Sequence, residues 1–226
     1  LGIKRLLSVA GGSMGGMQVL EWAVSHPESV ASAIPIASTA RHSAQQIAFN
    51  EVGRQAIMAD PDWNGGDYYD APDGQGPHRG MGLARRVAHL TYRCETELDL
   101  RFGRDPQDGE DPYAGGRFAV ESYLDHQADK LAQRFDANTY IALTEAMNSH
   151  DIGFNRGGVV EALRAITIPV LVVSIDTDRL FPPRLQVEIA DLVPKAKKLV
   201  TISSDFGHDG FLVESEAMSA AIRGII

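Results

Sequence analysis

The chain lacks most features that mark secreted, membrane-spanning or nucleic-acid-binding proteins. Its 226 residues contain one cysteine, Cys94, so no disulfide can form within the chain. No stretch approaches the roughly 18 to 20 unbroken apolar residues of a membrane span, and the apolar start leads directly into glycines rather than a signal-peptide cleavage site. The formal net charge is −9 and there is no basic run, which argues against nucleic acid and anionic membranes as partners. These absences predict a protein of the reducing cytoplasm.

Apolar runs of strand length alternate with helical patterns at both ends of the chain. Strands are expected at residues 3–10, 30–38, 168–176 and 197–204. A helical pattern follows most of them, and in residues 182–194 Pro183 suits the first turn of a helix. This alternation predicts an α/β fold built on a parallel sheet.

The middle of the chain breaks the alternation. It contains helical patterns near residues 42–58, 81–94, 117–134 and 137–148, and no convincing strand. We therefore expect residues 1–40 and 165–226 to form one α/β core, with residues 41–164 inserted as a helical segment.

A serine lies between glycine pairs where the first strand is expected to end. The segment GGSMG, residues 11–15, matches the pattern G-x-S-x-G, and Ser13 is the candidate nucleophile. A sharp strand-to-helix turn brings the backbone so close that side chains at Gly11 and Gly15 are expected to clash. The N–H of Met14 would then form one half of an oxyanion hole. The simpler alternative is a tight turn that happens to contain a serine.

A nucleophilic serine needs a base, and a base is oriented by an acid. Among seven histidines, His208 is distinguished by its place in a glycine-containing loop after the last expected strand. Two carboxylates follow the third expected strand, and we favour Asp178 because it lies in the loop, leaving Asp176 as a turn or capping residue. The order Ser13, Asp178, His208 is that of the α/β-hydrolase triad.

Four segments together closely resemble the homoserine O-acetyltransferase family, which has the α/β-hydrolase fold. They are GGSMGGMQVLEWAVSHPE, GLARRVAHLTYR, SIDTDRLFPPRLQVEIADLVP and GHDGFLVESEA. The resemblance covers essentially the whole chain and implies a ping-pong reaction of methionine biosynthesis. In that reaction the serine takes acetyl from the co-substrate acetyl-CoA, and the side-chain hydroxyl of L-homoserine then takes it from the serine. It also implies a homodimer formed through a helical lid, no metal and no permanently bound cofactor.

The same resemblance implies a binding site for an amino-acid acceptor. Arg85, helped by Tyr92, is expected to bind the carboxylate, and Asp209 the ammonium group. Arg85 and Tyr92 are seven residues apart and fall near one face of a helix. The alternatives are an exposed lid arginine, a core aromatic residue and a loop carboxylate. Arg156 also looks typical of the family, but the sequence assigns it no role.

Other readings remain open at this point. The same fold could use succinyl-CoA as donor or serine as acceptor. A serine esterase or thioesterase would need no site for a zwitterion. A binding protein that retains the fold would have no need of Ser13, Asp178 and His208 together.

The family carries a long segment before the nucleophile strand, so we expect this chain to be the C-terminal part of a longer protein. Without that segment the first strand would expose an unpaired edge and the oxyanion hole would lack its second N–H. We predict that the chain alone is weakly stable and nearly inactive. Its turnover should be compared with that of a version extended before Leu1, and equal turnover would contradict the prediction.

Overall fold

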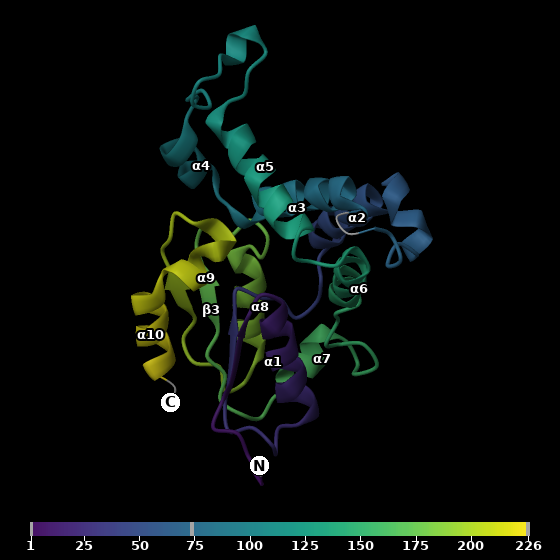
Figure 1. Ribbon diagram of the computed structural model, residues 1–226. Coiled ribbons are helices and arrows are strands. Elements are labelled where there is room, and N and C mark those ends of the chain that lie inside the picture. Colours follow the sequence, from purple (N-terminus) through teal and green to yellow (C-terminus); the bar gives the residue numbers. More distant parts are fainter. Residues whose placement is uncertain (1, 73–74, 225–226) are drawn as a thin grey trace. The chain divides into compact units, whose positions relative to one another are not determined.

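A computed structural model of the chain describes residues 2–72 and 75–224 (Figure 1). The chain divides into two compact units, the first formed by residues 1–42 and 149–226 and the second by residues 43–148. Residues 1, 73–74 and 225–226, which belong to the expected core and insertion, lie outside the described residues.

The first unit contains a parallel sheet. Its strands in the described residues are β1 (Val9–Gly12), β2 (Ala33–Ile36), β3 (Val173–Ile175) and β4 (Val200–Ile202), in the spatial order β1-β2-β3-β4. The predicted parallel sheet is confirmed, but the strands are shorter than the apolar runs. Outer parts of those runs form only single bridges. Leu6 pairs with Val30, and Val170 pairs with Ala196, one residue before the fourth run. The ladder of β1 also continues through Gly11 and Gly12, two residues beyond the expected end of the strand.

Helices cover both faces of this sheet (Figure 1). One face packs against α1 (Met14–Ser25), α7 (Val159–Arg164) and α8 (Pro183–Leu192), and the other against α10 (Ser215–Arg223), which follows the short α9 (Gly210–Val213). Because successive strand residues point to opposite faces, Ala33 packs toward α1 whereas Ile34 packs toward α10. Pro183 begins α8, as expected.

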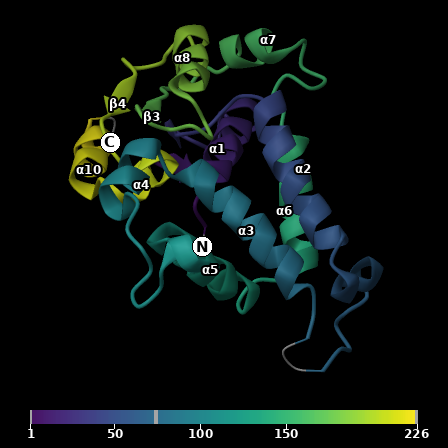
Figure 2. The ribbon, with the colours of Figure 1, turned by 90° about the horizontal axis from the view of Figure 1, so that it is seen from above.

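The second unit is helical. It contains α2 (Ala44–Met58), α3 (His78–Tyr92), α4 (Glu95–Phe102), α5 (Ala119–Ala132) and α6 (Ala137–Asn148). Figure 2 shows α3 between α2 and α5. The apolar core of this second unit includes Ile57, Met81 and Leu131. Helix α4 was not among the expected helices, although Glu95 and Glu97 in its first turn are suited to a helix N-terminus.

The expected insertion, residues 41–164, is longer than this second unit. Residues 149–164 belong to the first unit because Ile152, Val159 and Leu163 pack into the same core cluster as α1 and α8.

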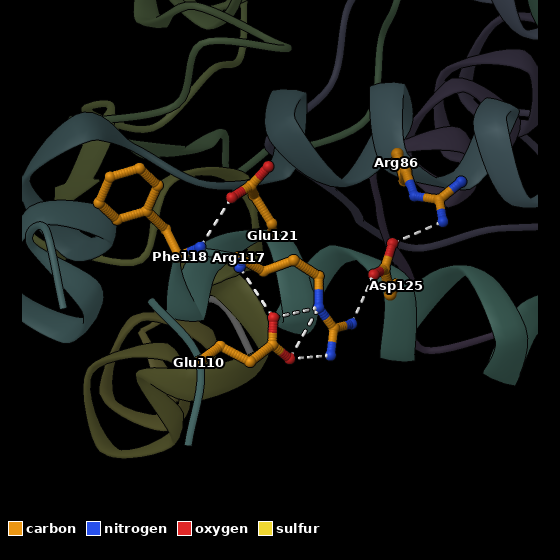
Figure 3. Close-up of polar contacts among 6 residues, drawn as sticks. All are labelled: Arg86, Glu110, Arg117, Phe118, Glu121 and Asp125. Atoms are coloured by element: carbon orange, nitrogen blue, oxygen red, sulfur yellow. Dashed lines mark hydrogen bonds and ion pairs between the residues drawn. The ribbon is translucent and has the colours of Figure 1, made fainter. Parts of the chain in front are cut away.

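Ion pairs fasten the long loop between α4 and α5 (Figure 3). Arg117 pairs with Glu110 and with Asp125, at 3.0 Å from the latter, and Asp125 also binds Arg86 of α3 at 2.7 Å. These groups are partly exposed, so we expect each pair to stabilise the loop only modestly.

The glycines around Ser13 are not equally constrained. A Cβ at Gly11 would lie 2.6 Å from the backbone C and O of Gly15, and one at Gly16 would lie 2.4 Å from the Cβ of Ser38. At Gly15, by contrast, an added Cβ meets no atom of the described residues within 4 Å. The expected crowding therefore occurs at Gly11, and the expectation for Gly15 is wrong.

This difference predicts opposite outcomes for two small substitutions. Gly11→Ala should lower the free energy of unfolding by about 1–3 kcal/mol, because the backbone must shift to admit the methyl group. Gly15→Ala should leave it unchanged or raise it by up to about 1 kcal/mol, since alanine favours the helical backbone. Urea unfolding of the two variants makes the comparison, and equal losses would contradict it.

Candidate active site

Ser13 occupies a strained turn between β1 and α1. Its φ and ψ are 55° and −124°, unusual for a residue with a side chain. The N–H of Ser13 donates to the carbonyl of Ile36 at the end of β2 (2.9 Å), and its own carbonyl accepts from the N–H of Gly16 (2.9 Å). A conformation of this kind costs on the order of 1–3 kcal/mol and persists because surrounding contacts impose it.

Met14 is the first residue of α1, so its N–H has no acceptor within the helix. An N–H at this position can donate to a negatively charged oxygen, helped by the helix dipole. Both properties suit the oxyanion role expected for Met14.

Asp178 and His208 form a buried pair. The Nδ1 of His208 lies 2.6 Å from Oδ2 of Asp178, and the two residues are 4% and 3% exposed. The other oxygen of Asp178 accepts the N–H groups of Leu180 (2.9 Å) and Phe181 (2.8 Å). Asp176 instead accepts the N–H of Ser204 (3.0 Å), so the structure brings Asp178 and not Asp176 to the imidazole.

A second set of bonds holds the two loops that carry this pair. The hydroxyl of Thr177 donates to the carbonyl of Ser204 (2.5 Å) and accepts the N–H of Gly207 (3.1 Å). Thr177 adjoins Asp178, and Gly207 adjoins His208. These bonds therefore hold the loops after β3 and β4 in register.

Aromatic rings connect the imidazole to the serine turn. The ring of Phe181 stacks on that of His208 with centroids 5.0 Å apart, and the edge of Phe211 meets it at 5.3 Å. Phe211 also lies against Gly12, where an added Cβ would be 2.4 Å from the ring. Phe211 thus contacts both the residue before Ser13 and His208.

Ser13, Asp178 and His208 follow β1, β3 and β4 at the carboxyl edge of one sheet, where α/β proteins bind their ligands. An imidazole whose Nδ1 is held by a carboxylate presents Nε2 as a base, and the carboxylate stabilises the charged ring that forms. The arrangement is suited to nucleophilic acyl transfer.

The remaining candidates have different surroundings. Arg85 and Tyr92 lie on α3 in the second unit, with the guanidinium carbon 5.4 Å from the ring centroid, a cation–π contact. Asp209 is partly buried in the single helical turn Gly207–Asp209 that contains His208. Arg156 binds both carboxylate oxygens of Glu21 on α1, at 3.2 and 2.9 Å, which gives it a structural role.

His89 is a buried residue of α3 that was not among the expected site residues. It is 3% exposed, and its Nε2 lies 2.6 Å from the hydroxyl of Tyr123. Its ring also meets that of Tyr92, with centroids 6.2 Å apart. Burial, together with nearby arginines that include Arg85, lowers the pKa of His89 to about 4, so the ring is neutral at pH 7. Its spacing from Arg85 and Tyr92, four and three residues, is the one sequence signal that it shares their helix face.

The described residues show neither a metal site nor a membrane span. They contain no group of three or more His, Cys, Asp or Glu side chains placed to hold a metal ion. No helix among them has the length and apolar character needed to cross a membrane.

The parallel sheet and the strand–turn–helix at Ser13 define a class of protein. A family model described as the alpha/beta hydrolase fold matches residues 1–215. The chain belongs to the alpha/beta hydrolase fold family, as predicted.

Within this family the chain is similar to acetyltransferases. It is 56% identical over 225 residues to homoserine O-acetyltransferase of Thermobifida fusca, an alignment that covers 100% of this chain and 59% of the relative. A crystal structure of homoserine O-acetyltransferase from Bacillus anthracis matches with a TM-score of 0.85 and 26% identity, over 97% of this chain and 60% of that one. An acetylester hydrolase from Corynebacterium glutamicum matches with a TM-score of 0.83 and 27% identity, over 100% and 61%. The chain therefore spans about three-fifths of the length of these proteins.

The lowered pKa of His89 predicts a pH dependence of stability. Between its unfolded pKa of about 6.5 and its folded pKa of about 4, the unfolded chain binds the proton and the folded chain does not. The free energy of unfolding should therefore fall as the pH decreases through this interval. His89→Gln should reduce the fall, whereas replacement of the exposed His126 by Gln should not, as judged by urea unfolding at pH 7 and pH 4.5. An unchanged pH dependence in His89→Gln would contradict the prediction.

Proposed function

We propose that this chain carries the catalytic residues of an acyltransferase that moves acetyl from acetyl-CoA to the hydroxyl of L-homoserine in methionine biosynthesis. The observation that carries the proposal is the buried His208–Asp178 pair, 2.6 Å apart, on the same sheet edge as the strained Ser13. The 56% identity to a homoserine O-acetyltransferase supports the choice of donor and acceptor.

In the first half-reaction the oxygen of Ser13 attacks the thioester carbonyl while Nε2 of His208 takes the serine proton. The tetrahedral oxyanion accepts the N–H of Met14. When the intermediate collapses, the carbon–sulfur bond breaks and the thiolate of CoA receives the proton from His208. Asp178 stabilises the charged imidazole between these steps.

In the second half-reaction the hydroxyl of homoserine replaces the thiol. His208 takes its proton, the oxygen attacks the acetyl carbonyl, and the proton passes to the departing oxygen of Ser13. In this proposal Arg85 and Tyr92 bind the acceptor's carboxylate and Asp209 its ammonium group, which orients the hydroxyl. The inserted helical segment would serve as a lid that excludes water, since water would hydrolyse the acyl-enzyme.

The assembly and location are proposed on the same basis. We propose a homodimer formed through the inserted helical segment and residence in the cytoplasm, which the single, buried Cys94 suits. No permanently bound cofactor takes part in the proposed steps.

The second candidate function is ester or thioester hydrolysis, favoured by the similarity to an acetylester hydrolase at 27% identity. Transfer to serine, or from succinyl-CoA, is a variant of the first. Thiol release by the version extended before Leu1 distinguishes them when each donor is offered with homoserine, with serine or with no amino acid. We expect sustained release over many turnovers only with acetyl-CoA and homoserine, and sustained release that ignores the amino acid would establish the hydrolase.

The acceptor site is tested by Arg85→Lys and Asp209→Asn. Each should raise the KM for homoserine about 10–100-fold, because an ionic hydrogen bond contributes about 1.5–3 kcal/mol. The rate of acyl-enzyme formation should not change. Arg79→Lys, at an exposed arginine of the same helix, is the control and should leave both values unchanged. An unchanged KM in Arg85→Lys would remove Arg85 from the proposed site.

A further inference from the structure

A chain of buried polar side chains reaches the serine turn from α8. The hydroxyl of Ser174 donates to Oε1 of Gln186 (3.1 Å), and Nε2 of Gln186 donates to the carbonyl of Ser38 (2.5 Å). The hydroxyl of Ser38 then donates to the carbonyl of Ser13 (2.8 Å). Ser174 and Gln186 are 0% exposed and Ser38 is 1% exposed. Buried polar groups are costly unless bonded, so this series fixes each member in one orientation.

The last bond of the series, from Ser38 to the carbonyl of Ser13, acts on the peptide that joins Ser13 to Met14. The N–H of this peptide is the proposed oxyanion donor. The carbonyl of Ser13 and the N–H of Met14 belong to the same planar peptide and point in opposite directions. Any contact that fixes the direction of that carbonyl therefore also fixes the direction of the Met14 N–H. A hydrogen bond accepted by the carbonyl also polarises the peptide, which makes the N–H a stronger donor.

Ser38 provides this contact from outside the helix. The carbonyl of Ser13 also accepts the N–H groups of Gly16 (2.9 Å) and Met17 (3.3 Å), but both belong to α1 and move with it. Ser38 instead follows β2, next to Ala37, whose φ of 44° is itself strained and whose N–H donates to Val173 of β3 (2.8 Å). The hydrogen bond from Ser38 thus fixes the orientation of the Ser13–Met14 peptide relative to the sheet.

Ser38 has little freedom to move. A Cβ at Gly16 would lie 2.4 Å from its Cβ, so Ser38 packs directly on the first turn of α1. The bond that Nε2 of Gln186 donates to the carbonyl of Ser38 is a second contact that restrains this residue.

We propose that Ser38 is a positioning residue that directs the N–H of Met14 toward the oxyanion, with Gln186 and Ser174 holding it in place. Ser38 acts through the Ser13–Met14 peptide and contacts no substrate. The inference rests on the proposed function, in which the Met14 N–H receives the oxyanion.

The test compares two buried serines with the same type of bond. Ser32 precedes β2, is 7% exposed, and donates its hydroxyl to the carbonyl of Leu7 (3.0 Å), at the opposite end of the strand from Ser38. Ser38→Ala and Ser32→Ala each remove one buried hydroxyl that bonds a backbone carbonyl. Both are made in the version extended before Leu1, and folding is checked by the thermal midpoint.

We expect single-turnover thiol release from acetyl-CoA to slow about 10–100-fold in Ser38→Ala and less than about twofold in Ser32→Ala, since losing an oxyanion donor outright costs about 10²–10³-fold. The KM for acetyl-CoA and the pKa read from the pH profile of kcat/KM should not change in either variant. A boronic acid that forms a tetrahedral adduct on serine should lose affinity in Ser38→Ala by a similar factor to the rate. Ser38→Cys, which keeps a weak donor, should fall between wild type and Ser38→Ala, and it replaces Ser38→Ala if that variant does not fold.

Three results would overturn the inference: equal rates in Ser38→Ala and Ser32→Ala, a loss of rate with unchanged affinity for the boronic acid, or a shifted pKa in the pH profile. The last would mean that the substitution disturbs His208 instead of the oxyanion donor. Failure of the proposed function is recognised separately, because the wild-type protein would then release no thiol from acetyl-CoA, or would release it over many turnovers at a rate that homoserine does not change.

Discussion

The site depends on the buried carboxyl group of Asp178, because a buried polar group is costly unless hydrogen-bond donors satisfy it. Two backbone N–H groups satisfy one oxygen and the imidazole of His208 satisfies the other. The carboxyl group is thus held in place, and it fixes Nδ1 as the nitrogen of His208 that faces Asp178. The bonds of Asp176 and Thr177 to the loop of His208 maintain this geometry from the neighbouring positions.

The serine turn uses a different physical device, backbone strain imposed by close packing. Positive φ values at Ser13 and Ala37 mark the carboxyl ends of β1 and β2, and Ser38 links them through the carbonyl of Ser13. A side chain has no room at Gly11, where backbone atoms of Gly15 occupy the space, or at Gly16, where the side chain of Ser38 does. Gly15 has no such neighbour among the described residues. The sheet therefore supports both Ser13, the proposed nucleophile, and the peptide proposed to stabilise the oxyanion.

Local patterns predicted much of this fold. Alternating apolar runs and helical patterns identified the parallel sheet and the principal helices, and the loop position of Asp178 favoured it over Asp176 as the partner of His208. Long-range packing was not predictable. The bond from Gln186 to Ser38 joins residues 148 positions apart and leaves no periodic signal. Likewise, the structural role of Arg156 depends on its contact with Glu21, 135 positions away, and sequence patterns do not indicate such a contact.

Mass spectrometry can test directly whether Ser13 is the nucleophile of an acyl transfer. The extended protein is mixed with acetyl-CoA alone, and the reaction is quenched before the protein is analysed. We expect one acetyl group per chain, on the peptide that contains Ser13. It should be absent from Ser13→Ala and should be removed when homoserine is added. Thiol release with acetyl on another residue, or with no acetyl-enzyme at any time, would contradict it.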